Sequence, residues 1–368
     1  LINQLQYYKG VLELNKRGFG FVKVDEEREF YIHDTNMKDA LNQDVVLIEK
    51  IKSHGNREEG RVVRVLRRGQ IRYVGEVKRG RKEYIIKTDD PKFDKPIIVD
   101  MAHAHGAMPG HKVVVEIKAF KPQIKGDIVK IIGHRNDPGV DILSIVHAHD
   151  VDIEFPKEVY EQIENISDEI DPSDIENRVD LRNELIVTID GDDAKDLDDA
   201  ISLKKLDNGH YQLGVHIADV SYYVTEGSPL DKEAIKRGTS IYLVDRVIPM
   251  LPHKLSNGIC SLNPNTDRYT ISCIMEIDKH GEVVNHEIVP SVIHSSYRMT
   301  YNNVNKILDG NQDLQKEYAP AIPLFFLMQE LATLLRKVRD ERGASDFDVD
   351  EAKVIVDKKG KPTDVVLR

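Results

Sequence analysis

The chain of 368 residues has no tryptophan and only two cysteines, Cys260 and Cys273. Two thiols cannot form a disulfide framework or a cysteine-rich zinc site, and such scarcity is typical of a reducing compartment, so we expect a cytoplasmic protein. No apolar run reaches the roughly 20 residues that a membrane-spanning helix needs, and we expect neither a membrane span nor a secretory signal. The chain starts at Leu1 and its last segment breaks off without a terminal cap, which we interpret as a fragment of a longer protein.

The formal net charge of −11 disfavours nucleic-acid binding on composition alone, but the charges are unevenly distributed. Ten cations stand against two acids between Arg61 and Lys87, and acids predominate between residues 150 and 199. This division predicts that the basic part holds a polyanion and that metal ions neutralise the acidic part. The basic stretch would either follow phosphates or form the wall of an entry channel, and ordinary solvated surface charge is the alternative to both.

The order of short apolar runs predicts three domains. About the first 150 residues alternate Val-, Ile- and Tyr-rich runs with turns, and the pattern restarts near Gly69, so we expect two cold-shock-like OB barrels over residues 7–68 and 69–148. A linker around residues 137–139 should follow. Residues 149–368 mix strands with helices, including a helix over 322–339 that Gly343 ends, which predicts an α+β domain. We expect this third domain to be incomplete at its C-terminal end.

Aromatic residues in the first barrel follow strand spacing. Phe19 and Phe21 lie two residues apart, as do Tyr31 and His33 in the next run, so each pair faces one side of its strand. Arg17 adds a positive charge beside them. Exposed rings next to cations form a platform on which single-stranded bases stack. Placement in the barrel core is the alternative, but the two stretches resemble the nucleic-acid-binding motifs of cold-shock domains, which favours RNA binding.

The densest chemical signal is the aspartate-rich segment from Asp190 to Asp199, between a β-branched run and a second apolar stretch. Crowded carboxylates repel one another unless a cation lies among them, and Mg²⁺ is held by carboxylate and phosphate oxygens. Asp190 would end a strand, and Asp196, Asp198 and Asp199 follow six, eight and nine residues later, so that four carboxylates can face one cavity. Two Mg²⁺ ions held there, with Mn²⁺ as an alternative, would clamp a scissile phosphate. Lys195 in the loop would offset part of the repulsion.

Other metal and phosphate sites fit less well. An EF-hand loop that starts at Asp190 would need glycine where Lys195 stands and glutamate where Ile201 stands. The glycine-lysine signature of a P-loop is missing. Two histidine pairs with a spacing of two, which on a strand would share a face, are the zinc alternative, and we expect surface histidines because no third ligand is close by. These pairs are His103 with His105 and His147 with His149.

Two blocks resemble a known family: residues 188–200, which contain the aspartates, and residues 240–264, which start Ser-Ile-Tyr-Leu-Val-Asp-Arg. Both are similar to signatures of the ribonuclease II and ribonuclease R (RNB) family of exoribonucleases, and the bacterial ribonuclease R branch is the most similar. The resemblance covers essentially the whole chain. It implies a processive monomer that hydrolyses single-stranded RNA from its 3′ end to nucleoside 5′-monophosphates. Ribosomes or RNA-decay factors would be further partners.

The resemblance also implies roles for individual residues. Asp190 and Asp199 would bind the first Mg²⁺, Asp196 would help hold a second metal, and Asp198 would orient the attacking water or a metal. Two aromatic residues would stack on the RNA: Tyr242 on the terminal base and Phe347 at the far end of the base stack.

One departure limits what the resemblance implies. The arginine-rich motif, the active-site glutamate and the C-terminal OB-type domain of the family lie beyond the residues of this sequence. We therefore expect the fragment to bind RNA and metal with little or no turnover of its own. The alternative function is a cold-shock-type RNA-binding module without nuclease activity.

Overall fold

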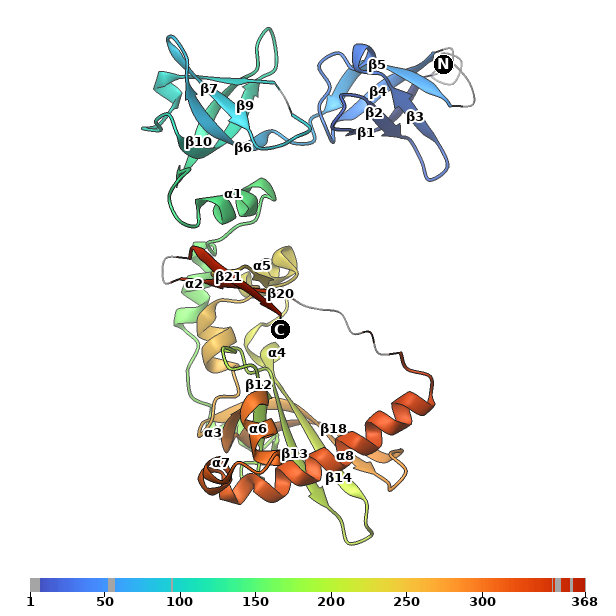
Figure 1. Ribbon diagram of the computed structural model, residues 1–368, viewed down its shortest axis with the longest axis vertical. Helices are drawn as coiled ribbons and strands as arrows, with labels where there is room; N and C mark the ends of the chain where they lie inside the picture. Colours follow the sequence, from blue (N-terminus) through green and yellow to red (C-terminus); the bar gives the residue numbers. More distant parts are fainter. Residues whose placement is uncertain are drawn as a thin grey trace. The chain divides into compact units, whose positions relative to one another are not determined.

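The computed structural model describes residues 7–51, 57–93, 95–345, 347, 352–357 and 360–367. The chain divides into two compact units (Figure 1). One comprises residues 1–152 with 354–366, and the other comprises residues 153–353 with 367–368.

The first barrel is built from five short strands that close on themselves in the order β1-β2-β3-β5-β4. The strands are β1 (Tyr7–Leu14), β2 (Gly20–Lys23), β3 (Glu29–Ile32), β4 (Val45–Ile51) and β5 (Glu59–Arg67). Their inward residues form one core, in which Leu12, Val22, Phe30 and Ile48 are fully buried. A closed five-stranded barrel of this kind is the OB architecture that the sequence predicts.

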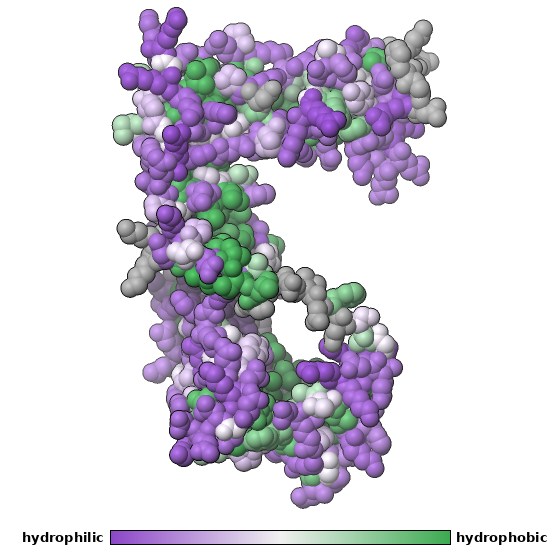
Figure 2. All heavy atoms as spheres, in the orientation of Figure 1, coloured by the Kyte–Doolittle hydropathy of each residue, from purple (hydrophilic) through white to green (hydrophobic). Residues whose placement is uncertain are grey.

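The second barrel repeats this architecture with the strand order β10-β8-β7-β6-β9. Its strands are β6 (Arg72–Arg79), β7 (Glu83–Thr88), β8 (Ile97–Asp100), β9 (His111–Ala119) and β10 (Lys125–His134). The surface of both barrels is mostly hydrophilic on the face that Figure 2 shows.

Helix α1 (Val140–Ala148) follows the second barrel, where the sequence predicts only a linker. Gly139 has a φ of 78° and leads into it. His147 lies in the last turn of this helix and His149 just after it, so this histidine pair does not share a strand face, and that premise of the zinc alternative is wrong.

The second unit is built on a seven-stranded sheet with the order β11-β18-β17-β14-β13-β12-β19. The central pairs are antiparallel, whereas β11 runs parallel to β18 and β12 parallel to β19. The strands are β11 (Val179–Asp180), β12 (Val187–Asp190), β13 (Asp199–Lys205), β14 (Tyr211–Ala218), β17 (Asp267–Ile277), β18 (Val283–His294) and β19 (Tyr297–Thr300). Two hairpins are separate from it, β15 (Ile241–Tyr242) with β16 (Val247–Ile248) and β20 (Ala352–Val356) with β21 (Pro362–Leu367).

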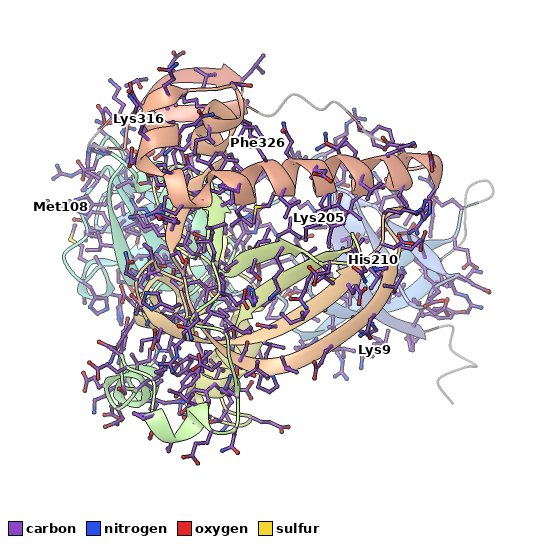
Figure 3. The ribbon with its side chains drawn as sticks, turned by 90° about the horizontal axis from the view of Figure 1, so that it is seen from below. Lys9, Met108, Lys205, His210, Lys316 and Phe326 are labelled. Atoms are coloured by element: carbon purple, nitrogen blue, oxygen red, sulfur yellow. The ribbon has the colours of Figure 1, made fainter. Side chains whose placement is uncertain are left out.

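Helices cover both faces of this sheet because neighbouring strand residues point to opposite sides. Ile186 packs with α2 and α5, and Val187 packs with α6 and α8. Figure 3 shows Lys205 between α8 and the strands, and its ammonium lies 2.9 Å from Glu330 of that helix. The helices are α2 (Lys157–Glu164), α3 (Pro172–Ile175), α4 (Val220–Tyr223), α5 (Pro229–Arg237), α6 (Tyr301–Leu308), α7 (Gln312–Glu317) and α8 (Ile322–Glu341).

Helix α8 ends close to where the sequence predicts, with Gly343 at a φ of 90° just beyond it. In the described part of the chain, no helix combines the length and the apolar character that crossing a membrane requires. An α+β unit that follows two OB barrels is the fold class expected from the sequence.

Candidate active site

The aspartate-rich segment connects β12 and β13, two neighbouring strands of the sheet. Asp190 is the last residue of β12 and Asp199 is the first residue of β13. The two strands are antiparallel, with Val187 opposite Ile201, so the end of one lies beside the start of the other. The segment leaves the sheet and returns to it, which brings the carboxylates at its two ends together.

The four predicted aspartates lie close enough together for their charges to act on one another. Burial raises the pKa of Asp190, and the charges of Asp199 and Asp196 raise it further. The pKa of Asp198 is raised by burial and then by Asp196, Asp199 and Asp190, although its side chain keeps contact with solvent. Each raised pKa reports a carboxylate whose negative charge is disfavoured where it stands.

The second sequence block holds the middle of the aspartate segment in place. Leu197 is buried between Asp196 and Asp198, and its N–H donates to the Ser261 hydroxyl at 3.1 Å. Ser261 in turn donates to the Lys195 carbonyl at 3.3 Å. The Leu197 carbonyl accepts from the Leu262 N–H at 2.8 Å. The two blocks that resemble the family signatures are therefore one structural unit.

The outer part of the segment is held by β19 and α6, which lie next to β12. Arg298 donates to the Ala194 carbonyl at 2.5 Å, and Asn302 donates to the Asp192 carboxylate at 2.6 Å. The charge of Arg298 also lowers the pKa of Asp190, opposing the effect of burial and of the other carboxylates. Nothing in the sequence pattern marks Arg298 for this role, which we expected of Lys195.

Tyr242 stands beside the carboxylates on the short strand β15. Its hydroxyl donates to Asp196 at 2.7 Å, and this hydrogen bond is the main cause that raises the pKa of Tyr242 to about 12. The side chain is 67% exposed, so the ring is free to contact a ligand. A ring that faces solvent next to acidic groups fits the stacking role that the resemblance implies.

The carboxylates fit a divalent cation that brings other ligands with it. Oδ2 of Asp190 is buried and has no hydrogen-bond partner within the described residues. Across those same residues, no three carboxylate, imidazole or thiol groups are placed so that they could hold a metal ion by themselves. Mg²⁺ is usually held by one or two carboxylates together with waters and substrate phosphates, so an orphaned carboxylate oxygen in a partial donor set suits it.

A cluster of aromatic rings lies outside the core of the first barrel. Phe21 of β2 is directly opposite Tyr31 of β3, with ring centroids 5.7 Å apart. Phe19 completes the cluster, 5.8 Å from Phe21 and 5.5 Å from Tyr31. Phe30 and Val22 point inward instead, which settles the core alternative for these rings. We call Phe19, Phe21 and Tyr31 the aromatic platform.

Cations border the aromatic platform. The Arg57 guanidinium lies 5.7 Å from the ring centroids of both Phe21 and Tyr31, a contact that sequence spacing does not reveal. Arg17 lies in the turn just before Phe19. His33 follows β3, and its ring nitrogen lies 2.9 Å from the Thr35 hydroxyl and 2.6 Å from Asp34.

Phe347 is 84% exposed and lies between residues outside the described part of the chain. Its place in a base stack stays a prediction.

Comparison with known proteins identifies the family. Residues 178–368 match the family model of the RNB domain, residues 85–156 that of a cold shock domain and residues 10–65 that of the ribonuclease B OB domain. The chain belongs to the RNB domain family. The resemblance drawn from the two sequence blocks is thereby confirmed, as is the fold class of OB-type domains followed by an RNB domain.

Relatives of the RNB chain carry the name ribonuclease R. It is 45% identical over 368 residues to "Ribonuclease R" of Thermotoga maritima, which covers 98% of the chain and 51% of the relative. It is 43% identical over 383 residues to "Ribonuclease R 1" of Lactococcus lactis, which covers 98% of the chain and 46% of the relative. The RNB chain spans about half the length of these curated relatives.

A solved structure of Mycoplasma genitalium RNase R in complex with ribose methylated single-stranded RNA is similar over most of the RNB chain. The TM-score is 0.87 at 29% sequence identity, and the match covers 98% of this chain and 58% of the other.

Proposed function

We propose that the whole protein is a 3′–5′ exoribonuclease that depends on Mg²⁺ and hydrolyses single-stranded RNA to nucleoside 5′-monophosphates. The observation that carries the proposal is the convergence of Asp190, Asp196, Asp198 and Asp199 where β12 and β13 meet. Family membership and the names of the relatives support it. The scarcity of cysteine still favours the cytoplasm as its location, and a monomeric state remains a prediction.

The residues of the site suggest how the chemistry is divided. When bound, two Mg²⁺ ions would activate the attacking water and stabilise the oxygen that leaves the scissile phosphate. Asp190 offers its orphaned oxygen to such an ion, and Asp198 lies near enough to the other carboxylates to share in the same site. The exposed ring of Tyr242 would stack on the last base and thereby place the last phosphate against the carboxylates.

The barrels supply affinity for the strand. Base stacking on the aromatic platform is worth about 1–3 kcal/mol for each base and tolerates any sequence, as a nuclease that degrades RNA from one end requires. The guanidinium of Arg57 beside two of the rings adds attraction for the phosphates. The similar RNase R structure solved with single-stranded RNA supports RNA as the ligand.

The test separates RNA binding from chemistry. RNA with a free 3′-hydroxyl end is incubated with the whole protein in Mg²⁺ or in EDTA, and the products are separated by chromatography. We expect nucleoside 5′-monophosphates in Mg²⁺ alone. Asp198→Asn should keep RNA affinity within about twofold and lower the rate of product release by at least about 100-fold, the scale expected when a group that acts on the transition state is lost. An unchanged rate in this variant would refute the proposed site.

The alternative is an RNA-binding module without nuclease activity. The aromatic platform favours this alternative as much as it favours the nuclease, because stacking requires no chemistry. It predicts RNA binding that survives Asp198→Asn and no product that depends on Mg²⁺ in any preparation. The same chromatogram therefore distinguishes the two functions.

A further inference from the structure

Arg298 of β19 lies on the same face of the sheet as the carboxylate that ends β12. The two strands run parallel, with Thr188 opposite Arg298. Successive side chains of a strand alternate between the two faces of a sheet, and Val187 and Met299 pack in one core with residues of α8. Arg298 therefore points to the other face, together with Thr188 and Asp190.

The guanidinium of Arg298 reaches the loop that joins β12 to β13. It donates to the Ala194 carbonyl at 2.5 Å. Its charge also opposes the rise in the pKa of Asp190 that burial and Asp199 cause, so the guanidinium lies near that carboxyl. The bond to Ala194 holds the loop against β19 two residues before Asp196, which is the next predicted ligand along the chain.

Arg298 stands beside acidic groups without being paired to one. Within the described part of the chain, its side chain donates only to the neutral Ala194 carbonyl and forms no ion pair. A guanidinium forms its strongest hydrogen bonds with carboxylates, often through two parallel N–H groups. Here Oδ2 of Asp190 has no partner among the same residues. Arg298 thus fixes the backbone of the loop and leaves free the oxygen that a metal ion would need.

A second anchor holds the same loop two residues earlier. Asn302, in the first turn of α6, donates to the Asp192 carboxylate at 2.6 Å. Helix α6 follows β19 without a break, so both anchors come from one short stretch of chain. The loop is fixed to this stretch at two points, and the Arg298 bond is the one that lies nearer to Asp196.

The charge of Arg298 and its bond to the loop have opposite effects on a metal ion. A positive charge near the carboxylates repels Mg²⁺, so the charge alone would weaken metal binding. The bond fixes the backbone that carries the carboxylates, and groups that orient metal ligands in this way typically matter about 10- to 100-fold in affinity. Arg298 is exposed, so water and salt screen its charge but not its hold on the loop. We therefore expect the bond to outweigh the charge.

We propose that Arg298 is a positioning residue for the metal-dependent reaction, which holds the loop between Asp190 and Asp196 so that their carboxylates face one divalent cation. Arg298 itself contacts neither the metal nor the RNA. The proposal rests on the nuclease function proposed above and adds to that function a residue outside the aspartates and Tyr242.

The first test measures Mg²⁺ binding to the full chain without RNA, by isothermal titration calorimetry. Arg298→Ala should raise the dissociation constant about tenfold, the lower end of the cost of losing such a group. Arg298→Lys keeps the charge and a donor, so its dissociation constant should lie between those of wild type and Arg298→Ala. A dissociation constant in Arg298→Ala equal to or below that of wild type would overturn the proposal, because an arginine that acts through its charge alone predicts this result.

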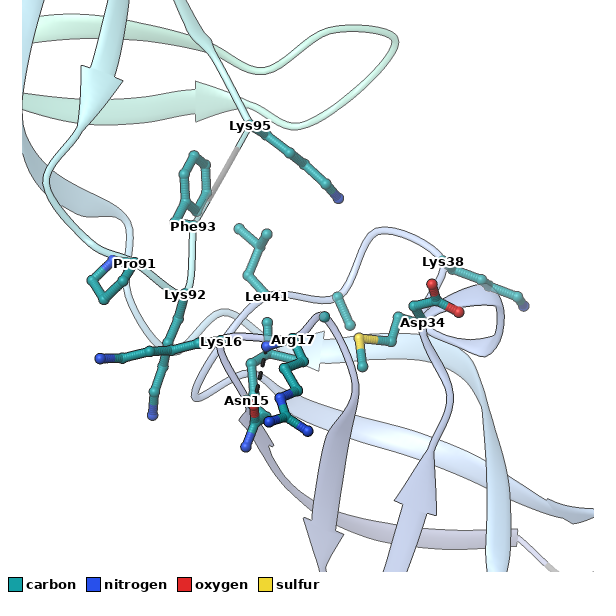
Figure 4. Close-up of a pocket in the computed structure, with 14 residues that line it drawn as sticks. Asn15, Lys16, Arg17, Asp34, Lys38, Leu41, Pro91, Lys92, Phe93 and Lys95 are labelled. Carbon is teal, nitrogen blue, oxygen red and sulfur yellow. Dashed lines mark hydrogen bonds between the residues drawn. The ribbon is translucent and has the colours of Figure 1, made fainter.

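Lys38→Ala is the matched control. Lys38 lines a cavity between the two barrels (Figure 4), and its ammonium also donates to a backbone carbonyl, that of Val63, at 2.6 Å. This variant should keep the wild-type dissociation constant for Mg²⁺. Thermal melting in EDTA shows whether each variant is folded. Lower thermal stability of Arg298→Ala with an unchanged dissociation constant for Mg²⁺ would mean that Arg298 serves the fold alone, which would overturn the proposal.

The second test measures the release of mononucleotides by the whole protein. Arg298→Ala should lower kcat about tenfold at limiting Mg²⁺ and less than about threefold in excess Mg²⁺, with KM for RNA within about twofold of wild type. A raised KM that excess Mg²⁺ does not restore would show that the guanidinium binds RNA and would overturn the positioning role. A wild type without Mg²⁺-dependent product would instead refute the proposed function, and the calorimetry would still decide whether Arg298 positions a metal site.

Discussion

The hydroxyl of Tyr242 donates a hydrogen bond to Asp196 at 2.7 Å, and this bond links the exposed ring to the carboxylate cluster. While it lasts, Asp196 has one oxygen engaged and is less available to a cation. When neither RNA nor metal is bound, this hydrogen bond joins the ring that would stack on RNA to a carboxylate that would hold metal.

The variant Tyr242→Phe keeps the ring and removes this hydrogen bond. We expect the dissociation constant for Mg²⁺, measured by isothermal titration calorimetry, to fall by about two- to tenfold, the equivalent of one net hydrogen bond. Tyr301→Phe is the matched control, because Tyr301 is 61% exposed and its hydroxyl makes no hydrogen bond in the described part of the chain. Weaker Mg²⁺ binding by Tyr242→Phe would mean that the hydroxyl orients Asp196 toward the metal instead of competing with it.

Repulsion between the carboxylates of the site should lower the stability of the folded protein when no cation is bound. Asp190→Asn removes a charge that burial and the neighbouring carboxylates disfavour. In EDTA the variant should be more stable than wild type by up to about 1 kcal/mol, because solvent screens part of the repulsion. Wild type should gain thermal stability on addition of Mg²⁺, and the variant should gain less. Asp207→Asn, in the exposed turn between β13 and β14, should change neither quantity. A variant less stable than wild type in EDTA would show that Asp190 is held by interactions other than a missing cation.

Ser261 should matter to both stability and metal binding. Ser261→Ala leaves the buried N–H of Leu197 without its acceptor and the Lys195 carbonyl without its donor. We expect a loss of about 1–3 kcal/mol in unfolding free energy, with weaker Mg²⁺ binding because Leu197 lies between Asp196 and Asp198. Denaturant titration and calorimetry measure the two effects, and the exposed Ser167→Ala provides the reference. Wild-type Mg²⁺ affinity in Ser261→Ala would show that the carboxylates do not depend on this anchor.

A buried histidine in the sheet should make the stability of the fold depend on pH. His216 is fully buried, and its ring nitrogens lie 3.0 Å from the Ser202 hydroxyl and 2.7 Å from the Ser272 hydroxyl. Burial lowers the pKa of His216 to about 4, and the charge of Glu184 only partly opposes this. The ordinary pKa of histidine is about 6.5, so the unfolded chain binds a proton at this position as the pH falls below 6.5, whereas the folded protein does so only near pH 4. The contribution of His216 to the free energy of unfolding is therefore fully present above pH 6.5 and is lost as the pH falls from 6.5 toward 4.

Because of His216, the free energy of unfolding should be lower by about 2 kcal/mol at pH 5 than above pH 6.5. Melting of the second unit between pH 7.5 and 5 measures it. His216→Gln should lower stability at pH 7.5 and flatten its dependence on pH, whereas the exposed His280→Gln should leave the wild-type slope. A wild-type slope in His216→Gln would show that other groups cause the dependence.

The sequence allows the barrels to be predicted because their strands alternate apolar and polar residues with period two. Strand β5 has the same alternation in its first half, but Arg61, Arg64 and Arg67 give it the composition of a basic stretch, so the sequence alone does not mark it as a strand. Helix α1 is missed for another reason. Its short apolar run follows a Pro-Gly turn, and only packing against the second barrel distinguishes it from a linker.

The carboxylates of the site follow from their spacing at the end of a strand, since antiparallel neighbours return a short segment to its start. Their anchors do not follow from spacing. Ser261 is 64 residues from Leu197, Arg298 is 104 from Ala194 and Asn302 is 110 from Asp192. Contacts over such separations exist only once the sheet has formed, and a serine or an arginine has no local pattern that predicts them.

The direction and metal dependence of RNA shortening test the central claim most directly. The whole protein is incubated in Mg²⁺ with one RNA labelled at its 5′ end and with the same RNA labelled at its 3′ end. We predict that the 5′-labelled RNA shortens step by step while the 3′-labelled RNA releases labelled mononucleotide from the start, and that EDTA or Asp198→Asn stops both. Release of the 5′ label first, or shortening that continues in EDTA, would contradict the account.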